Sequence, residues 1–296
     1  MLGPLLLMIF LNDIVRSSSL LKFTIYADDA VLYLSSENLQ DLVDLFNREI
    51  ITTYHWIISN KLTLNINKTK AIIFSRGVVN LNGISELKIL DKKVEIIKEI
   101  KFLGVIITSN LSWKSHMNFI VGKISKINSI LYLTRNYICQ KSLKQIYYSL
   151  VYPYLTYCNI ICSSTYKNCL NPLILSQKRI IRTITFSRRY DHTDQLFQRL
   201  KIFKFEKLRI YCISQFVYKA LNGVIDLPNF FTYASDIHGR ELRDMFELRH
   251  PQFRSTQSRQ SIAFTGCTVW NNLHTDLQAM SSLNSFKSSL KNSLLS

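Results

Sequence analysis

Two adjacent aspartates, Asp28 and Asp29, stand in the middle of the apolar stretch FTIYADDAVLYL at residues 23–34. The aromatic and β-branched residues on both sides of the pair predict two short strands buried on both faces. Aspartate is common in the tight turn that joins such strands. Two ionised carboxylates beside apolar walls repel each other and lose hydration, and a divalent cation removes this conflict. Because Mg²⁺ typically takes one or two carboxylates together with substrate phosphates, Asp28 and Asp29 are candidate metal ligands.

The alternative interpretation of this pair is a solvated Asp-Asp turn on a surface hairpin. Two neighbouring aspartates, taken without their surroundings, favour that alternative because aspartate is an ordinary turn residue. The strongly apolar flanks favour the metal site. The pair alone is compatible with both interpretations.

The positive charge of the chain is concentrated after residue 110. Of the net charge of +17, residues 1–110 contribute little, since 12 Lys or Arg face 11 Asp or Glu there. Residues 111–190 contain 12 basic residues and no acidic one. A solvated face normally mixes both signs, so this segment predicts a polyanionic partner. An anionic membrane surface is the alternative, but nucleic acid is favoured because aromatic residues interleave with the cations. These aromatic residues are Tyr132, Tyr137, Tyr147 and Tyr148.

Length and composition predict a folded protein with two or three domains. The chain has 296 residues, of which 47% are hydrophobic. The apolar run at residues 5–11 is too short to span a bilayer and lacks the basic start of a signal peptide, so we expect a buried helix and an intracellular protein without a membrane partner. Cys158, Cys162 and Cys169 lack the second close pair of a zinc site, which predicts reduced, mostly buried cysteines.

The elements expected in residues 1–110 give an α+β fold, with helices packed against a small antiparallel sheet. A helix is expected over residues 4–16 and a hairpin over 21–34. Ser35 or Ser36 is expected to cap an amphipathic helix that runs to about Ile58. Strands are expected over residues 62–75, 92–97 and 100–108.

After Trp113 the apolar pattern becomes helical. A helix is expected to bury Ile120, Ile124 and Leu131, with Lys123 and Lys126 on its flank. Further helices are expected over 140–163, 171–187, 194–222 and 275–294, with irregular structure over 223–265. The domain limits are expected near residues 110 and 190.

The ordered set of motifs resembles the reverse transcriptases of non-LTR, LINE-type and jockey-like retrotransposons. YADD at 26–29 resembles their catalytic box, and GPLLLMIFLNDI at 3–14 resembles the segment before that box. NKLTLNINKTK at 60–70 and KFLGVIIT at 101–108 resemble the blocks that follow it. LSWKSHMNFIVGKISK at 111–126, QKRIIR at 177–182 and the VWNNL and SFKSSLK motifs near the end are similar to later parts of these proteins.

The resemblance implies RNA-directed DNA synthesis by two-metal nucleotidyl transfer, with RNA template, DNA primer and deoxynucleoside triphosphates as partners and Mg²⁺ as cofactor. Residues 1–110 would be a partial polymerase palm, residues 111–190 a basic helical thumb, and residues 191–296 a C-terminal extension that is helical and irregular. Asp28 would be the main metal ligand and Asp29 the weaker one. A protein that acts on chromosomal DNA is expected in the nucleus.

The resemblance also implies roles for residues outside the YADD box. Lys68, or alternatively Lys70, would neutralise the triphosphate, unless both are merely exposed cations on an edge strand. The primer strand would be held by Phe102, Leu103 and Gly104, since glycine permits a close approach of the backbone. The nucleic-acid backbone would contact five cations of the thumb: Lys123, Lys126, Lys178, Arg179 and Arg182.

One departure from the family concerns the third carboxylate, which such polymerases carry on a strand well before the box. Only 27 residues precede Asp28 here, and Asp13 falls in the expected helix. The fingers also have no counterpart, so we expect the truncated C-terminal portion of a reverse transcriptase that is inactive alone. The alternatives are a catalytically incomplete remnant that still binds nucleic acid, and a relic without function.

Overall fold

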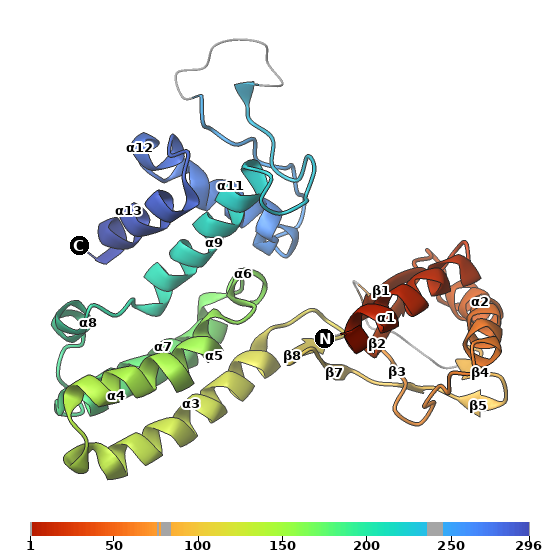
Figure 1. The fold of residues 1–296 in the computed structure, drawn as a ribbon, viewed down its shortest axis with the longest axis horizontal. Helices are drawn as coiled ribbons and strands as arrows, with labels where there is room; N and C mark the ends of the chain where they lie inside the picture. Colours follow the sequence, from red (N-terminus) through yellow and green to blue (C-terminus); the bar gives the residue numbers. More distant parts are fainter. Residues whose placement is uncertain (1, 76, 78–83, 236–244, 296) are drawn as a thin grey trace. The chain divides into compact units, whose positions relative to one another are not determined.

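The computed structural model describes residues 2–75, 77, 84–235 and 245–295, and the chain forms two compact units. The first unit is Met1–Leu111 and the second is Ser112–Ser296. The first combines helices with short strands, and the second is mainly helical (Figure 1). The expected α+β class is therefore confirmed. The expected domain limits and the names palm and thumb remain predictions.

The first unit begins with the helix α1 (Leu2–Leu11) and the 3-10 helix η1 (Asn12–Ser17), where a helix was expected over residues 4–16. The expected burial of this helix is wrong, because Leu2, Met8 and Ile9 are 66%, 67% and 64% exposed. The helix is apolar around its whole circumference, so its sequence does not select one face for the core. Phe10 of this helix lies beside Trp56 of the next helix, with their ring centres 6.4 Å apart. Among the described residues no helix is both long and apolar enough to cross a membrane.

The helix α2 (Leu39–Ser59) contributes Val43 and Ile50 to the core of the first unit. Its N-cap is Asn38, whose Oδ1 accepts a hydrogen bond from the backbone N–H of Gln40 at 2.9 Å. The expected cap at Ser35 or Ser36 is therefore wrong; Ser36 accepts from the N–H of Asn38 at 3.3 Å and so stabilises the turn before the cap. The buried residues of this core are Val43, Ile50, Leu87, Ile89 and Val94.

The described strands of the first unit form four separate two-stranded sheets, so the single small sheet that we expected is wrong. Two are clear antiparallel hairpins: β1 (Lys22–Tyr26) with β2 (Asp29–Tyr33), and β7 (Glu99–Phe102) with β8 (Val105–Thr108). The other two pair β3 (Lys70–Ala71) with β6 (Glu95–Ile96) in parallel, and β4 (Lys88–Ile89) with β5 (Lys92–Lys93) in antiparallel orientation.

Two expected strands are interrupted by turns. The expected strand over 62–75 contains a turn in which the carbonyl of Asn65 accepts from the N–H groups of Lys68 and Thr69, both at 3.1 Å. Asparagine favours such turns, and only Lys70–Ala71 pairs as a strand. The expected strand over 100–108 is a hairpin instead, because Leu103 and Gly104 both have positive φ, 44° and 82°. Positive φ at both central residues is typical of a two-residue hairpin turn.

The second unit begins with α3 (Lys114–Thr134), which lies against α7 (Lys167–Thr185) (Figure 1). The expected apolar face of α3 is confirmed, since Ile120, Ile124 and Leu131 are buried. Between these helices the chain forms α4 (Gln140–Ile146), a π-helical turn η3 (Tyr147–Val151), α5 (Tyr152–Thr156) and α6 (Asn159–Cys162). The helices expected over 140–163 and 171–187 are thus confirmed in outline.

The rest of the second unit has its own core around α9 (Phe205–Leu221), α11 (Ile262–Asn271) and α13 (Leu283–Leu295). The expected helix over 194–222 is divided, because Lys201 adopts a left-handed φ of 52° between α8 (Asp194–Leu200) and α9. The expected helix over 275–294 is α12 (Thr275–Gln278) followed by α13. The expected irregular stretch 223–265 includes residues 236–244, which lie outside the described residues, and α11 begins within its last residues.

Candidate functional site

The aspartate pair lies at the tip of the β1–β2 hairpin, as the sequence predicted. Tyr26 pairs with Asp29 at the end of the ladder, so Ala27 and Asp28 form a two-residue turn. Ala27 has a φ of 53°, a left-handed conformation that such turns require and that alanine adopts less readily than glycine. The hairpin therefore holds Asp28 in its turn and Asp29 as the first residue of β2.

The surroundings of this pair are open to solvent, and the expectation of strands buried on both faces is wrong. Tyr26 and Tyr33 are 64% and 49% exposed, and both aspartates are exposed. The hairpin reaches the core of the first unit through Leu32, which packs against it and is partly buried. With water available to both carboxylates, the desolvation that would demand a cation is absent, so this geometry agrees with the solvated turn that was the alternative interpretation.

The donor chemistry of the pair suits Mg²⁺, but the set of donors is incomplete. Asp28 and Asp29 offer hard carboxylate oxygens, and neither forms an ion pair with another described residue. Throughout the described part of the chain, no three His, Cys, Asp or Glu side chains gather as a metal site would require. Asp13 lies in η1, where its carboxylate is 3.8 Å from Arg16. Asp28 and Asp29 therefore fit Mg²⁺ as part of a ligand set.

Of the two lysines predicted to meet the triphosphate, the structure leaves Lys68 available. Lys70 is engaged, because its Nζ donates to the carboxylate of Glu95 across the β3–β6 pair. Lys68 is exposed, its side chain has no ion pair with a described residue, and its backbone N–H closes the Asn65 turn. Beside this turn lies a polar pocket of about 290 Å³, formed by residues 63–67 and Lys92.

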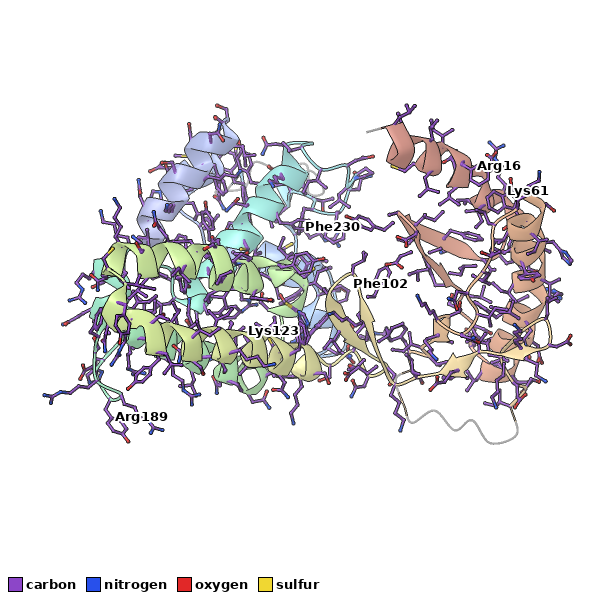
Figure 2. All side chains as sticks on the ribbon, turned by 60° about the horizontal axis from the view of Figure 1, so that its bottom comes forward. Arg16, Lys61, Phe102, Lys123, Arg189 and Phe230 are labelled. Carbon is purple, nitrogen blue, oxygen red and sulfur yellow. The ribbon has the colours of Figure 1, made fainter. Side chains whose placement is uncertain are left out.

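The residues predicted to hold the primer lie around the β7–β8 turn. Phe102 ends β7 (Figure 2), and Leu103 and Gly104 are the two turn residues. Val105, which follows them, is buried and anchors β8. This hairpin and the YADD hairpin belong to the same unit but to different sheets, so no ladder of backbone hydrogen bonds joins them.

The five predicted cations of the second unit come from two helices. Lys123 and Lys126 are exposed on α3, and the ammonium of Lys123 lies 5.5 Å from the centre of the Phe119 ring (Figure 2). Arg179 is exposed on α7, whereas its neighbours Lys178 and Arg182 are half-buried.

Lys178 and Arg182 face the chain that follows α7. The guanidinium Nε of Arg182 donates to the backbone carbonyl of Asp191 at 3.0 Å. The pKa of Asp194 is lowered first by its hydrogen bond to Lys204 and, less strongly, by the charge of Lys178. These two cations therefore interact with polar or charged groups of the protein.

The charge imbalance predicted for residues 111–190 persists in the folded chain. None of the 12 cations in this segment forms an ion pair with any residue that the structure describes. In the same unit, Lys204 forms an ion pair with Asp194 at 2.9 Å, and both residues lie outside this segment. The surface of these helices therefore carries a large uncompensated positive charge.

The aromatic residues that we expected among these cations fall into two groups. Tyr137, Tyr132 and Tyr148 are 90%, 56% and 39% exposed, so they form the exposed group. Tyr147 is fully buried, burial raises its pKa, and its interpretation as a surface aromatic is wrong. Arg135 was missed in the sequence: its guanidinium lies 4.3 Å from the centre of the Tyr132 ring and 5.5 Å from that of Phe186. Arg135 directly follows α3 and is three residues after Tyr132, whereas its contact with Phe186, which directly follows α7, joins the ends of two helices.

The motifs near the end of the chain are structural. Trp270, in VWNNL, is buried and donates from Nε1 to the carbonyl of Phe246 at 3.1 Å. Asn271 makes two hydrogen bonds with the backbone of Leu248, at 2.9 Å each. Phe286, in SFKSSLK, is buried and stacks on Tyr218 at 4.5 Å. These motifs stabilise the core around α9, α11 and α13.

The cysteines show no sign of a shared site. All six are free; Cys162 and Cys267 are buried, Cys139 is exposed and the other three are intermediate. The expectation of mostly buried cysteines is therefore right for only two of them. Burial raises the pKa of Cys162 to about 12 and that of Cys212 to about 11, so both remain protonated thiols at neutral pH.

Comparison with known proteins gives one relative to report. No family model matches the chain, and no solved structure matches it. The chain is 23% identical over 220 residues to the RNA-directed DNA polymerase from mobile element jockey of Drosophila funebris. The match includes 70% of this chain and 24% of that protein, so this chain spans about a quarter of the length of its relative. The similarity supports a relationship to the RNA-directed DNA polymerases of mobile elements.

Proposed function

We propose that this chain is the part of a non-LTR retrotransposon reverse transcriptase that carries the YADD hairpin. The observation that carries the proposal is the hairpin itself. A two-residue turn presents Asp28 and Asp29 to solvent without ion pairs to described residues, in a chain similar to the jockey polymerase. Carboxylates with open access are what metal-dependent nucleotidyl transfer requires of such a segment.

In this proposal the residues of the first unit have different roles in nucleotidyl transfer. Asp28 is the main Mg²⁺ ligand and Asp29 the weaker one. The bound metal would activate the primer 3′-hydroxyl and stabilise the leaving pyrophosphate. Lys68 neutralises charge on the incoming deoxynucleoside triphosphate, and the backbone of Phe102, Leu103 and Gly104 positions the DNA primer on its RNA template. Such a protein would act on chromosomal DNA in the nucleus.

The chain by itself is proposed to be inactive as a polymerase. Two carboxylates are fewer than a two-metal site needs, and the described residues gather no third ligand beside them. The isolated chain should therefore give no extension of a primer on an RNA template with Mg²⁺ or Mn²⁺. Extension by the isolated chain that disappears in Asp28→Asn would contradict this expectation and require a further ligand.

A chimera tests the proposed role of the hairpin directly. This chain would replace the matched segment of the jockey polymerase, and primer extension would be measured. We expect the chimera to extend the primer and Asp28→Asn within it to abolish extension. Asp13→Asn is the matched control, since Asp13 is an exposed carboxylate outside the hairpin and should be dispensable. A folded chimera that extends equally well with Asp28→Asn would refute the metal site.

A second candidate function is a nucleic-acid-binding remnant of that polymerase, in which catalysis has been lost. The observation in its favour is the surface of the second unit, where 12 cations of residues 111–190 have no ion pair with described residues. Binding by such a surface would depend on the phosphate backbone and would need no carboxylate pair. Nucleic-acid binding that survives Asp28→Asn, together with an inactive chimera, would favour this candidate.

A further inference from the structure

The C-terminal ends of α3 and α7 meet at one end of the second unit. The Arg135 guanidinium lies over the rings of both Tyr132 and Phe186. Before these ends the two helices are also joined by a hydrogen bond from Thr183 Oγ1 to Asn128 Oδ1 at 2.9 Å. These contacts bring together residues that are about fifty positions apart in the sequence.

Aromatic rings at this end are unusually exposed. Tyr137 and Tyr190 are 90% and 86% exposed, and Phe186 is 48% exposed. A second arginine stands beside one of them, since the Arg189 guanidinium lies 5.9 Å from the centre of the Tyr190 ring and extends from the loop after α7 (Figure 2). We call the following set the aromatic–arginine end: Tyr132, Arg135, Tyr137, Phe186, Arg189 and Tyr190.

The charge at this end is positive. Neither Arg135 nor Arg189 forms an ion pair with a residue that the structure describes. Asp191 directly follows Tyr190, and its carboxylate accepts a hydrogen bond from the backbone N–H of Arg188 at 2.7 Å. Its carbonyl accepts from Arg182 at 3.0 Å, so Asp191 shapes the loop that carries Arg189 and Tyr190.

We infer that the aromatic–arginine end binds single-stranded nucleic acid. Exposed rings beside cations are the combination that binds single strands, because unpaired bases stack on the rings while arginines contact the phosphates. A duplex cannot use these rings, since its bases are already stacked on one another. This inference rests on the proposed function. It adds a site for unpaired nucleotides to a surface whose other cations would contact the phosphate backbone whatever the nucleotide sequence.

The test compares single-stranded and double-stranded probes on the full chain. Fluorescence anisotropy would measure the affinity for oligothymidylate and for a blunt duplex of the same length. The variant Tyr137→Ala/Tyr190→Ala should weaken binding of the single strand by about tenfold or more and leave the duplex affinity unchanged. Tyr166→Ala is the matched control, because Tyr166 is 52% exposed at the opposite end of α7. Tyr137→Trp/Tyr190→Trp should keep the affinity, and the probe should quench its indole fluorescence.

The outcomes of this test distinguish the single-strand site at the aromatic–arginine end from nucleic-acid binding by the chain as a whole. A wild-type chain that binds both probes, with single-strand affinity unchanged in the double alanine variant, would overturn this inference and leave the proposed nucleic-acid binding intact. Equal losses for single strand and duplex would overturn it as well. Failure of the wild-type chain to bind either probe would overturn the binding function itself. Loss of binding to phosphatidylserine vesicles alone would assign the aromatic–arginine end to a membrane and refute our assignment.

Discussion

Neighbouring side chains in the motif QKRIIR, at residues 177–182, have opposite environments. Gln177 is buried, and Ile180 and Ile181 belong to the main core of the second unit. The basic residues of the same motif are exposed or half-buried. The motif therefore combines a structural side with a charged side, and substitutions in it should separate stability from binding.

Gln177 makes three buried hydrogen bonds that join α7 to two other segments. Its Nε2 donates to the Tyr147 hydroxyl and to the Phe203 carbonyl, and its Oε1 accepts from the Phe205 N–H, all at 2.9 Å. Gln177→Leu would leave these partners buried without a hydrogen bond, so we expect a loss of about 2–4 kcal/mol of unfolding free energy. Urea denaturation measures it. Lys178→Gln is the control and should stay within about 0.5 kcal/mol of wild type.

Two thiols whose pKa is raised, the buried Cys162 and the partly buried Cys212, should make the protein sensitive to alkaline pH. Burial raises the pKa of Cys162 to about 12 and of Cys212 to about 11, from an ordinary value of 9.0. Above pH 9 the unfolded chain loses these protons and the folded chain keeps them, so stability is full below pH 9 and falls as pH rises toward 11. The loss is at most about 1.4 kcal/mol per pH unit for each thiol.

The measurement is the urea midpoint at increasing pH between 8 and 10. Cys162→Ala/Cys212→Ala should flatten the decline above pH 9, even though removing the side chains lowers stability at every pH. Cys139→Ala is the comparison, because Cys139 is exposed and its removal should leave the decline unchanged. A decline that is equally steep in the double variant would assign the alkaline sensitivity to other groups.

At the scale of helices and strands, close packing limits which substitutions the second unit can accommodate. The helices α9 and α11 pack together, and Phe231 lies against them in the same core. Gly266 in α11 is the point of closest approach, where a Cβ atom would lie 2.8 Å from two Phe231 ring atoms and 3.2 Å from Val217 Cγ2. The glycine is needed here for space, since its position in a helix would otherwise favour alanine.

Gly266→Ala should therefore destabilise the protein by about 1–3 kcal/mol, because overpacking outweighs the gain in helix propensity. Thermal or urea denaturation measures this. Gly122→Ala provides the matched control within α3, where a Cβ atom would meet nothing within 4 Å. This control should stabilise the protein by up to about 1 kcal/mol. If both substitutions stabilise equally, the contact between Gly266 and Phe231 is not limiting.

For the molecule as a whole, the distribution of charge between the two units is the main physical asymmetry. The first unit is nearly neutral, with 12 cations and 11 carboxylates over residues 1–110, and several carboxylates are paired, as Glu86 is with Lys88 and Lys93. The excess positive charge is carried by the second unit. A polyanion should therefore bind to the second unit, and its affinity should depend strongly on salt.

The salt dependence gives a quantitative test of the five predicted contacts: Lys123, Lys126, Lys178, Arg179 and Arg182. The logarithm of the binding constant should fall by about 0.7–0.9 per phosphate contact against the logarithm of salt concentration. Replacing all five residues by glutamine should flatten this slope, with little change in sequence preference, because backbone contacts do not read bases. Circular dichroism would confirm that the variant is folded.

Lys88→Gln/Lys93→Gln is the matched control for this experiment. Both lysines are paired with Glu86 in the first unit, so their loss should leave the slope unchanged. If the five-fold variant keeps the wild-type slope, the contacts lie on other cations, with Arg135 and Arg189 the first to examine. A slope near zero in the wild-type chain would exclude a phosphate-dominated interface.

The sequence by itself determined the features that depend on local chemistry. Alternating propensity and a turn residue were enough to place Asp28 and Asp29 at a hairpin tip, and the apolar period was enough to find the buried face of α3. The single-sign segment at residues 111–190 also follows from composition, because no carboxylate within it can compensate the charge. The order of the motifs indicated a relationship that the jockey similarity supports.

Only the tertiary structure decided the exposure of the YADD hairpin and of α1, and the meeting of distant residues. The strands around the aspartates and the helix α1 are apolar yet exposed, because burial depends on which elements cover a segment and not on its own composition. Gln177 looked like one polar residue in a basic motif, and its three buried partners lie on other segments. Arg135 and Phe186 meet only because α3 and α7 end together, a consequence of helix packing that no spacing along the chain could reveal.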